Sequence, residues 1–242
     1  MKKIIFILFT ITLFVSCSKS DNSNKIVMGT NAAFPPFEYI GGNNGDDVIG
    51  FDVEIAKEIA KDLGKKLEIA DMEFDTLLTA LNAKKVDFVI AGMTINEKRK
   101  ESVNFSDPYY EATQAVIVKA DSLLITNKND IKDKKIAVQL GTTGNSVAED
   151  FTTNVTAFQT GFEAILELKN GKVDAVIIDE QPAIAFLKKN PDLKIIEMNF
   201  DPEFYGIAAT KDNIELIKSI NKTLERLKSD GTYDRLMSEY MK

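Results

Sequence analysis

The sequence predicts an α/β protein with two lobes, each a central, mostly parallel sheet flanked by helices. A helix-to-strand pattern occurs twice, as FDTLLTALNAKKVD over residues 74–87 and as FEAILELKNGKVD over residues 162–174. Each copy is an amphipathic helix with a short basic turn, and each continues into an apolar strand, at 88–90 and 175–177. The recurrence of one unit indicates two lobes of similar architecture. The alternative is that any two α/β lobes share such a pattern.

The two copies end differently, and this difference predicts a ligand. The first strand leads into Ala91-Gly92-Met93-Thr94 and then Arg99, whereas the second ends at Asp179. In open α/β sheets, ligands bind at the carboxyl ends of the strands. We therefore expect a small zwitterion, held between a cation of one lobe and an anion of the other.

Composition excludes several classes of function. The 242 residues carry a formal net charge of -7, which argues against a nucleic-acid partner. The chain contains no histidine, so Ser-His-Asp triads, Cys-His dyads and histidine metal sites are excluded. We expect neither a cofactor nor a metal.

The N-terminal segment is typical of an exported lipoprotein. Lys2 and Lys3 precede an apolar stretch at 4–15, which is too short to span a bilayer comfortably. Phe14-Val15-Ser16-Cys17 resembles a lipobox, although leucine is usual where Phe14 stands. We expect a signal peptide at 1–16, lipidation of Cys17, a polar tether at 17–24, and therefore an extracytoplasmic, membrane-anchored protein. The alternative is a plain signal peptide with a chance cysteine.

Local patterns predict the remaining elements. Alternating apolar residues indicate strands, and apolar residues three and four apart indicate helices. In chain order the expected elements are a strand at 25–30, a loop at 31–38, a hairpin tip at 41–50, a helix at 53–63, a strand at 66–70, the first copy, a β-rich run at 113–119, a strand at 135–138, a helix at 144–151, a strand at 155–158, the second copy, a helix at 181–189, a strand at 193–198, a β-like run at 204–210, a helix at 213–229 and a short helix ending near residue 241.

Helix caps are expected at three places. Asp52 is the predicted N-cap of the first helix and Gly64 its C-cap. Thr94 and Glu97 are spaced as a capping box, with Thr94 as the cap. Asp75 also precedes a helix, and we assign Asp52, Asp75 and Glu38 structural roles.

Two β-like runs, at 109–113 and 201–205, bracket the second lobe on both sides. The chain therefore leaves the first lobe, builds the second and returns. We expect lobe 1 at 25–108 and 206–242, lobe 2 at 114–200, and the two bracketing runs as a two-strand hinge.

Six motifs, in order along residues 25–242, resemble the polar amino-acid family of extracytoplasmic (periplasmic) solute-binding proteins, the receptors of ABC importers. They are TNAAFPPFEY at 30–39, GFDVE at 50–54, AGMTINEKRK at 91–100, FSDPYY at 105–110, VQLGTTG at 138–144 and VDAVIID at 173–179. The resemblance implies the two-lobed type II periplasmic-binding-protein fold. It also implies a monomer that captures a free amino acid by cleft closure and delivers it to ABC permease subunits.

The charges of an amino acid need partners, because neither tolerates burial unpaired. Arg99 offers a fork for the carboxylate, and Thr94 and the amides near Thr142 and Thr143 add donors. Asp179 would take the ammonium, with the Gly92 carbonyl. The resemblance implies that Phe34 and Phe74 hold the aliphatic part of the ligand and that Asn31 and Gln139 face its side chain. The expected ligand-binding residues are Asn31, Phe34, Phe74, Gly92, Met93, Thr94, Arg99, Gln139, Thr142, Thr143 and Asp179.

Taken singly, these residues have plainer interpretations. Arg99 would be a solvated helix charge and Asp179 a helix cap. The aromatic residues would be core, and Thr142 and Thr143 a turn.

Other functions and several ligands stay open. One alternative is an enzyme similar to cyclohexadienyl dehydratases, which needs a general acid in the pocket; Glu38 is the nearby candidate. Another is an amino-acid-sensing ectodomain that works with a separate partner. Asn31 stands where some relatives that bind cationic side chains carry an acid, which weakens a lysine assignment. Arginine and glutamine are the favoured ligands, and we expect a binding protein rather than an enzyme.

Overall fold

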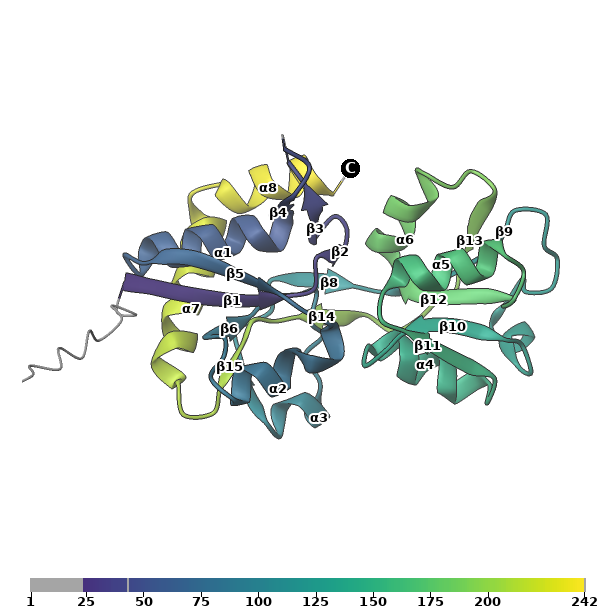
Figure 1. Ribbon diagram of the computed structural model, residues 1–242, viewed down its shortest axis with the longest axis horizontal. Helices are drawn as coiled ribbons and strands as arrows, with labels where there is room; N and C mark the ends of the chain where they lie inside the picture. The colour runs from purple at the N-terminus through teal and green to yellow at the C-terminus, as the bar shows by residue number, and fades with distance from the viewer. Residues whose placement is uncertain (1–23, 43, 242) are drawn as a thin grey trace, which may run out of the picture.

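The computed structural model describes residues 24–42 and 44–241, which form two lobes joined by two chain segments (Figure 1). The predicted signal peptide at 1–16, Cys17 and the tether up to residue 23 lie outside the described residues. In the part that is described, no helix is long and apolar enough to cross a membrane.

Lobe 1 is built on a five-stranded sheet in the order β5-β1-β6-β15-β7. β1, β5 and β6 are parallel, and β15 is antiparallel to both of its neighbours, β6 and β7. The strands are β1 (Lys25–Thr30), β5 (Lys66–Asp71), β6 (Phe88–Val89), β7 (Val103–Phe105) and β15 (Ala208–Thr210). Helices cover the sheet: α1 (Phe51–Asp62), α2 (Leu77–Asn82), α3 (Glu97–Lys100), α7 (Ile214–Ser229), α8 (Thr232–Tyr240) and the 3-10 turn η2 (Phe74–Thr76).

Lobe 2 repeats this plan. Its five-stranded sheet has the order β11-β10-β12-β9-β13, with β10, β11 and β12 parallel and β9 antiparallel to both of its neighbours. The strands are β9 (Gln114–Lys119), β10 (Ile136–Gln139), β11 (Val155–Phe158), β12 (Ala175–Asp179) and β13 (Leu193–Ile196). The helices are α4 (Thr143–Phe151), α5 (Gly161–Lys169), α6 (Glu180–Leu187) and the 3-10 turn η3 (Lys128–Ile131). The predicted fold class is confirmed.

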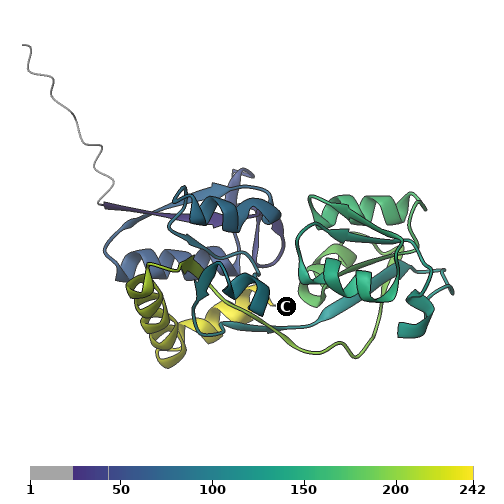
Figure 2. The same cartoon turned by 90° about the horizontal axis from the view of Figure 1, so that it is seen from below.

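Two short strands connect the lobes. β8 (Tyr110–Ala112) and β14 (Glu203–Tyr205) pair antiparallel as a separate two-stranded sheet. Figure 2 shows these two segments running side by side between the lobes. The chain enters lobe 2 through β8 and returns through β14, after which α7 and α8 pack against α1 of lobe 1.

Two predicted caps are wrong. α1 begins at Phe51 with Gly50 as its N-cap, so Asp52 lies inside the first turn and is buried. The cap of α3 is Asn96, whose side-chain oxygen accepts from the Arg99 amide at 2.8 Å; Thr94 lies before the helix. At α3 the Asn96 side chain caps the Arg99 amide, and at α1 the carbonyls of Pro36 and Phe37 accept from the first two helical amides, so neither predicted side-chain cap is used.

Gly64 ends α1 as a positive-φ residue directly after the C-cap Leu63. Its amide donates to Lys61 O and the amide of Lys65 donates to Ala60 O, which are the two bonds of a Schellman motif.

A small three-stranded sheet fixes the start of α1. It consists of β2 (Ala33–Phe34), β3 (Glu38–Gly41) and β4 (Asp47–Ile49). The amides of Phe51 and Asp52 donate to the carbonyls of Pro36 and Phe37. Gly50 adopts φ 134° there, and a Cβ on it would lie 2.1 Å from Phe37 O. This close approach requires glycine and brings the first turn of α1 against the segment that carries Glu38.

Candidate functional site

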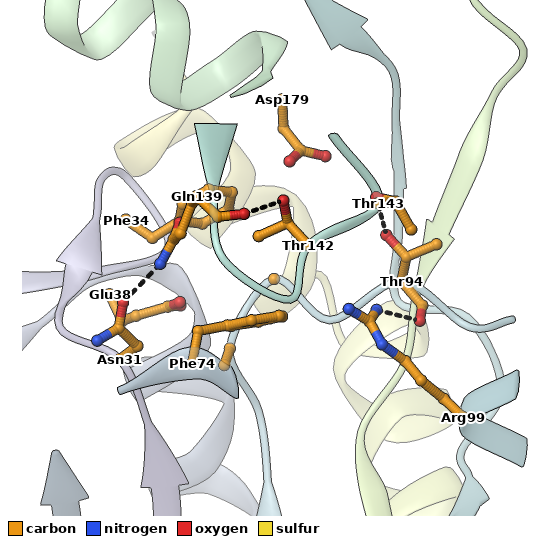
Figure 3. A pocket seen from close by; sticks show the side chains of 12 residues that line it. Asn31, Phe34, Glu38, Phe74, Thr94, Arg99, Gln139, Thr142, Thr143 and Asp179 are labelled. Atoms are coloured by element: carbon orange, nitrogen blue, oxygen red, sulfur yellow. Dashed lines mark hydrogen bonds between the residues drawn. The ribbon is translucent and has the colours of Figure 1, made fainter. Parts of the chain in front are cut away.

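A pocket lies between the lobes, where the carboxyl ends of the parallel strands face each other (Figure 3). Lobe 1 contributes residues that follow β1, β5 and β6, and lobe 2 contributes the ends of β10 and β12 and the start of α4. The pocket is lined by Asn31, Phe34, Glu38, Phe74, Ala91, Gly92, Thr94, Arg99, Gln139, Thr142, Thr143 and Asp179.

Arg99 lies buried in the wall of the pocket at 9% exposure. One guanidinium nitrogen donates to Thr94 O at 2.7 Å, and the other donates to Gly141 O of lobe 2 at 3.1 Å. The guanidinium carbon lies 5.3 Å from the centre of the Phe74 ring, which supports the group from one side. Burial lowers the pKa of Arg99, and the negative charges of Asp179 and Glu203 oppose this shift. The guanidinium is therefore held in place and, because both acceptors are neutral carbonyls, its charge remains available to an anion.

Donors from both lobes meet close to Arg99. The hydroxyls of Thr94 and Thr143 lie 3.4 Å apart, and both donate to the Glu203 carboxylate, at 2.7 and 2.6 Å. Thr142 caps α4: its hydroxyl accepts from the amide of Asn145 and donates to the carbonyl of Gln139. The first turn of α4 thus presents unpaired amides toward the pocket, where an anion is favoured.

Asp179 occupies the opposite side of the pocket, at the end of β12. Its carboxylate is buried and accepts from Gln114 Nε2 at 3.2 Å. Burial and the negative charge of Glu203 raise the pKa of Asp179 to about 7. A cation in the pocket would pair with this group and favour its charged form.

Two aromatic rings form the floor and wall of the lobe 1 side. Phe34 packs directly on Gly92, since a Cβ at Gly92 would lie 2.6 Å from the ring. Gly92 has a φ of 52°, and its amide donates to Asp52 Oδ2 at 2.8 Å. Phe74 lies in η2 and is also buried. An apolar ligand segment placed here would contact both rings.

Two neutral amides close another part of the pocket. Gln139 Nε2 donates to Asn31 Oδ1 at 3.0 Å and to Gln159 O at 3.1 Å, while Asn31 Nδ2 donates to Met72 O at 2.9 Å. Figure 3 shows Gln139 and Asn31 directed toward each other from opposite lobes.

A pair of carboxyls lies behind Phe34. Glu38 and Asp52 are both 0% exposed, and Glu38 lines the pocket. Burial is the main cause that raises the pKa of Glu38 well above its usual range, and the negative charge of Asp52 is the second cause. Burial also raises the pKa of Asp52, to about 6. Hydrogen bonds to Asp52 from the Gly92 amide and the Tyr109 hydroxyl oppose its shift.

The structure brings ten of the eleven residues expected from the sequence to one pocket; the eleventh, Met93, does not line it. Its side chain is buried in a core cluster of lobe 1 that includes Phe74 and Leu77. The ligand-binding residues expected from the sequence do not include Ala91 and Glu38, which line the pocket, or Glu203, which lies behind the threonines; Glu38 is expected only as the candidate acid of the alternative enzyme. Glu38 stands at the start of a strand that pairs with the loop after β1, a pairing without a sequence signal of its own.

The family model for bacterial extracellular solute-binding proteins, family 3, matches residues 26–242, nearly all of the described chain. The chain belongs to this family. The family is one of extracytoplasmic solute-binding proteins, and this solute-binding protein resembles amino-acid receptors of ABC transporters throughout its length.

Among curated relatives, the arginine-binding extracellular protein ArtP of Bacillus subtilis is 35% identical, over 99% of this chain and 98% of its own. ABC transporter arginine-binding protein 1 of Escherichia coli is 33% identical over 99% of both chains. The structure of holo ArgBP from T. maritima has a TM-score of 0.82 at 43% identity, covering 91% of this solute-binding protein and 97% of that chain. An ancestral arginine-binding protein bound to glutamine has a TM-score of 0.84 at 45% identity, covering 90% and 97%. The resemblance expected from the sequence is confirmed.

Proposed function

We propose that this solute-binding protein captures a free polar L-amino acid between its lobes, with arginine or glutamine as the ligand. The observation that carries the proposal is the placement of Arg99 and Asp179 in one pocket, each buried and on opposite sides. An α-amino acid brings a carboxylate and an ammonium that must both leave water, and each needs a partner of opposite charge. Arg99 takes the carboxylate, with help from the backbone amide of Thr94 and the first turn of α4, and Asp179 takes the ammonium.

The remaining pocket suits a side chain that is flat or extended and polar at its end. Phe34 and Phe74 contact its aliphatic part, and Asn31 and Gln139 offer hydrogen bonds at its tip. Arginine is favoured by the names of the relatives ArtP and ArgBP, and glutamine by the ancestral protein that was bound to it.

The proposed role includes delivery of the ligand to an ABC permease by a monomeric receptor that closes on it. Closure is supported by the ligand groups coming from both lobes, and by the single pair of strands, β8 and β14, that joins them. A permease then recognises the closed shape.

A thermal-shift screen of the mature protein against the twenty amino acids tests the ligand. A ligand that binds only the native state raises the melting temperature, so arginine or glutamine should give the largest shifts. If no amino acid raises the melting temperature, the proposed function is wrong. Calorimetry then gives the affinity and a one-to-one stoichiometry.

The proposal also includes anchoring at Cys17. Replacing Cys17 by serine should prevent acylation and release the protein from the membrane fraction. An unchanged mass of the mature chain and unchanged fractionation would show that the segment is a plain signal peptide.

One observation favours a second candidate, an enzyme similar to cyclohexadienyl dehydratases. Such an enzyme needs a protonated acid in the pocket, and Glu38 is a pocket-lining acid with a raised pKa. Incubation of the pure protein with prephenate or arogenate separates the two functions, because a binding protein yields no product.

A further inference from the structure

The carboxyls of Glu38 and Asp52 leave three buried oxygens without a hydrogen-bond donor. Neither oxygen of Glu38 nor Oδ1 of Asp52 accepts a hydrogen bond, although both residues are fully buried. Asp52 Oδ2 is satisfied, by the Gly92 amide at 2.8 Å and the Tyr109 hydroxyl at 2.7 Å. Within residues 24–42 and 44–241, no ion pair reaches Glu38 or Asp52. Buried acceptors of this kind call for a proton or a cation.

A proton shared by Glu38 and Asp52 would provide the missing hydrogen bond between the two carboxyl groups. When the Glu38 carboxyl is protonated, it donates to Asp52, which gives Oδ1 a partner and removes the repulsion between adjacent carboxylates. Nearby groups do not offer another hydrogen-bond donor to these oxygens. The Tyr109 hydroxyl is already donated to Asp52, and Asp71, at the end of β5, adds a further negative charge. Across the pocket lie Arg99, bound to two carbonyls, and Asp179.

Glu38 is the ionisable group of the pocket that the backbone charges of an amino acid do not use. Among the described residues that line it, the ionisable side chains are Glu38, Arg99 and Asp179. The last two have the two backbone charges of an amino acid as partners. The amides of Asn31 and Gln139 are neutral and bind each other. A cationic ligand side chain therefore has Glu38 as its carboxyl partner.

We propose, building on the amino-acid-binding function above, that Glu38 and Asp52 act as a proton-linked selector of the ligand side chain. With the shared proton in place, the Glu38 carboxyl is uncharged, and the pocket accommodates a neutral amide such as that of glutamine. When a guanidinium enters, the pair releases the proton to solvent and the Glu38 carboxylate pairs with the cation. One site then holds a neutral or a cationic side chain, and only the cationic one is bound with release of a proton.

The test compares arginine with citrulline, in which a neutral urea replaces the guanidinium with nearly the same shape. Calorimetry of the mature protein from pH 5.5 to 8.5 gives the ratio of the two affinities. The preference for arginine should rise by up to about tenfold per pH unit until the pair is ionised. The titration of Asp179 affects both ligands alike and cancels in the ratio. Repeating the titrations in buffers with different ionisation enthalpies should show up to one more proton released with arginine.

Glu38→Gln provides the matched variant, since glutamine keeps the size of the side chain and is able to donate to Asp52. In this variant the ratio of the two affinities should no longer depend on pH, and arginine should release no extra proton. The variant should bind arginine at least tenfold more weakly than the wild type, while it still binds citrulline. Asp47→Asn, an exposed carboxyl on the same hairpin, should leave all of these values unchanged.

A pH-independent ratio with equal proton release for both ligands in the wild-type protein would overturn the proposal, whatever the folding of the variant. In that outcome, amino-acid binding itself stands. If neither ligand nor any other amino acid binds, the proposed function fails first and the selector fails with it.

Discussion

Gln139 of lobe 2 donates a hydrogen bond of 3.0 Å to Asn31 of lobe 1, directly across the pocket (Figure 3). Each amide is also fixed within its own lobe, Asn31 to Met72 O and Gln139 to Gln159 O. Arg99 makes a second link between lobes through Gly141 O, and Thr94 and Thr143 make a third through Glu203, to which both hydroxyls donate. Residues that would hold a ligand thus also hold the lobes together, so ligand binding and closure share the same groups.

Domain closure is the first prediction. Because the proposed ligand contacts both lobes, it should favour the closed arrangement by its higher affinity for that state. Small-angle scattering should show the radius of gyration falling when arginine is added to saturation. The variant Gln139→Ala, which lacks one link between lobes, should have a larger radius than wild type before addition. An unchanged wild-type radius at saturating ligand would favour a preformed closed pocket instead.

Arg99→Ala should abolish amino-acid binding while the protein stays folded. The ligand carboxylate would lose its charged partner in a buried site, at a cost of at least about 3 kcal/mol. Calorimetry measures the affinity, and circular dichroism checks the fold. The control is Arg235→Ala, an exposed arginine on α8 that pairs with Glu239, which should bind normally. Near-native affinity in folded Arg99→Ala would remove Arg99 from the site.

The affinity for neutral amino acids should decrease below about pH 7. The ammonium requires ionised Asp179, whose pKa is raised to about 7 by burial and by Glu203. Binding is therefore fully favoured above this pH and weakens as pH falls through it, by up to about tenfold per unit. Glutamine titrations from pH 5 to 8 measure the slope. Asp179→Asn should bind weakly at every pH; retained binding in this variant would mean that the ammonium has another partner.

Glu38→Gln should stabilise the ligand-free protein at pH 8 and have less effect near pH 4. Burial raises the pKa of Glu38 in the folded state, so the wild type loses stability as pH rises from the unfolded-state pKa through the folded one. Glutamine stays neutral and avoids this loss of stability. Chemical denaturation at both pH values gives the difference. An equal effect at both would show that Glu38 does not change its charge on unfolding.

Gly50→Ala should destabilise the protein by about 3 kcal/mol or more. The new Cβ would lie 2.1 Å from Phe37 O, at a residue whose φ is 134°. Gly64→Ala is the control: φ is also positive, at 63°, but no atom lies within 4 Å, so only about 1 kcal/mol should be lost. Denaturant unfolding of both variants separates steric overlap from backbone preference. Equal losses would show that the overlap relaxes.

The sequence predicted the elements well wherever an apolar period was strong. The strand at 155–158 has the predicted bounds, and the long helix α7 begins one residue later than expected. Caps were harder to predict, because each helix begins at a different residue from the one expected. α3 begins at Glu97 with Asn96 as its cap, two residues after Thr94, and α1 begins at Phe51 with Gly50 as its cap, before Asp52.

Arg99 and Asp179 were easier to predict from the sequence than Glu38, for a physical reason. Arg99 and Asp179 follow strands whose ends must face the cleft, so topology alone predicts their place. Glu38 reaches the pocket through the pairing of β2 with β3 and the close contact at Gly50. Those are contacts between neighbouring backbones, which residue patterns do not encode.

The insertion of lobe 2 into lobe 1 has a consequence for the order of folding during synthesis. β15, near the C-terminus, lies between β6 and β7, whereas the five strands of lobe 2 all come from residues 114–196. A growing chain therefore holds every strand of lobe 2 before it holds the strand that completes the sheet of lobe 1. Domains usually mature from the N-terminus onward. Here the domain that begins first is completed after the second, and the arginine-bearing half of the pocket gains the last strand of its sheet only once all of lobe 2 has been made.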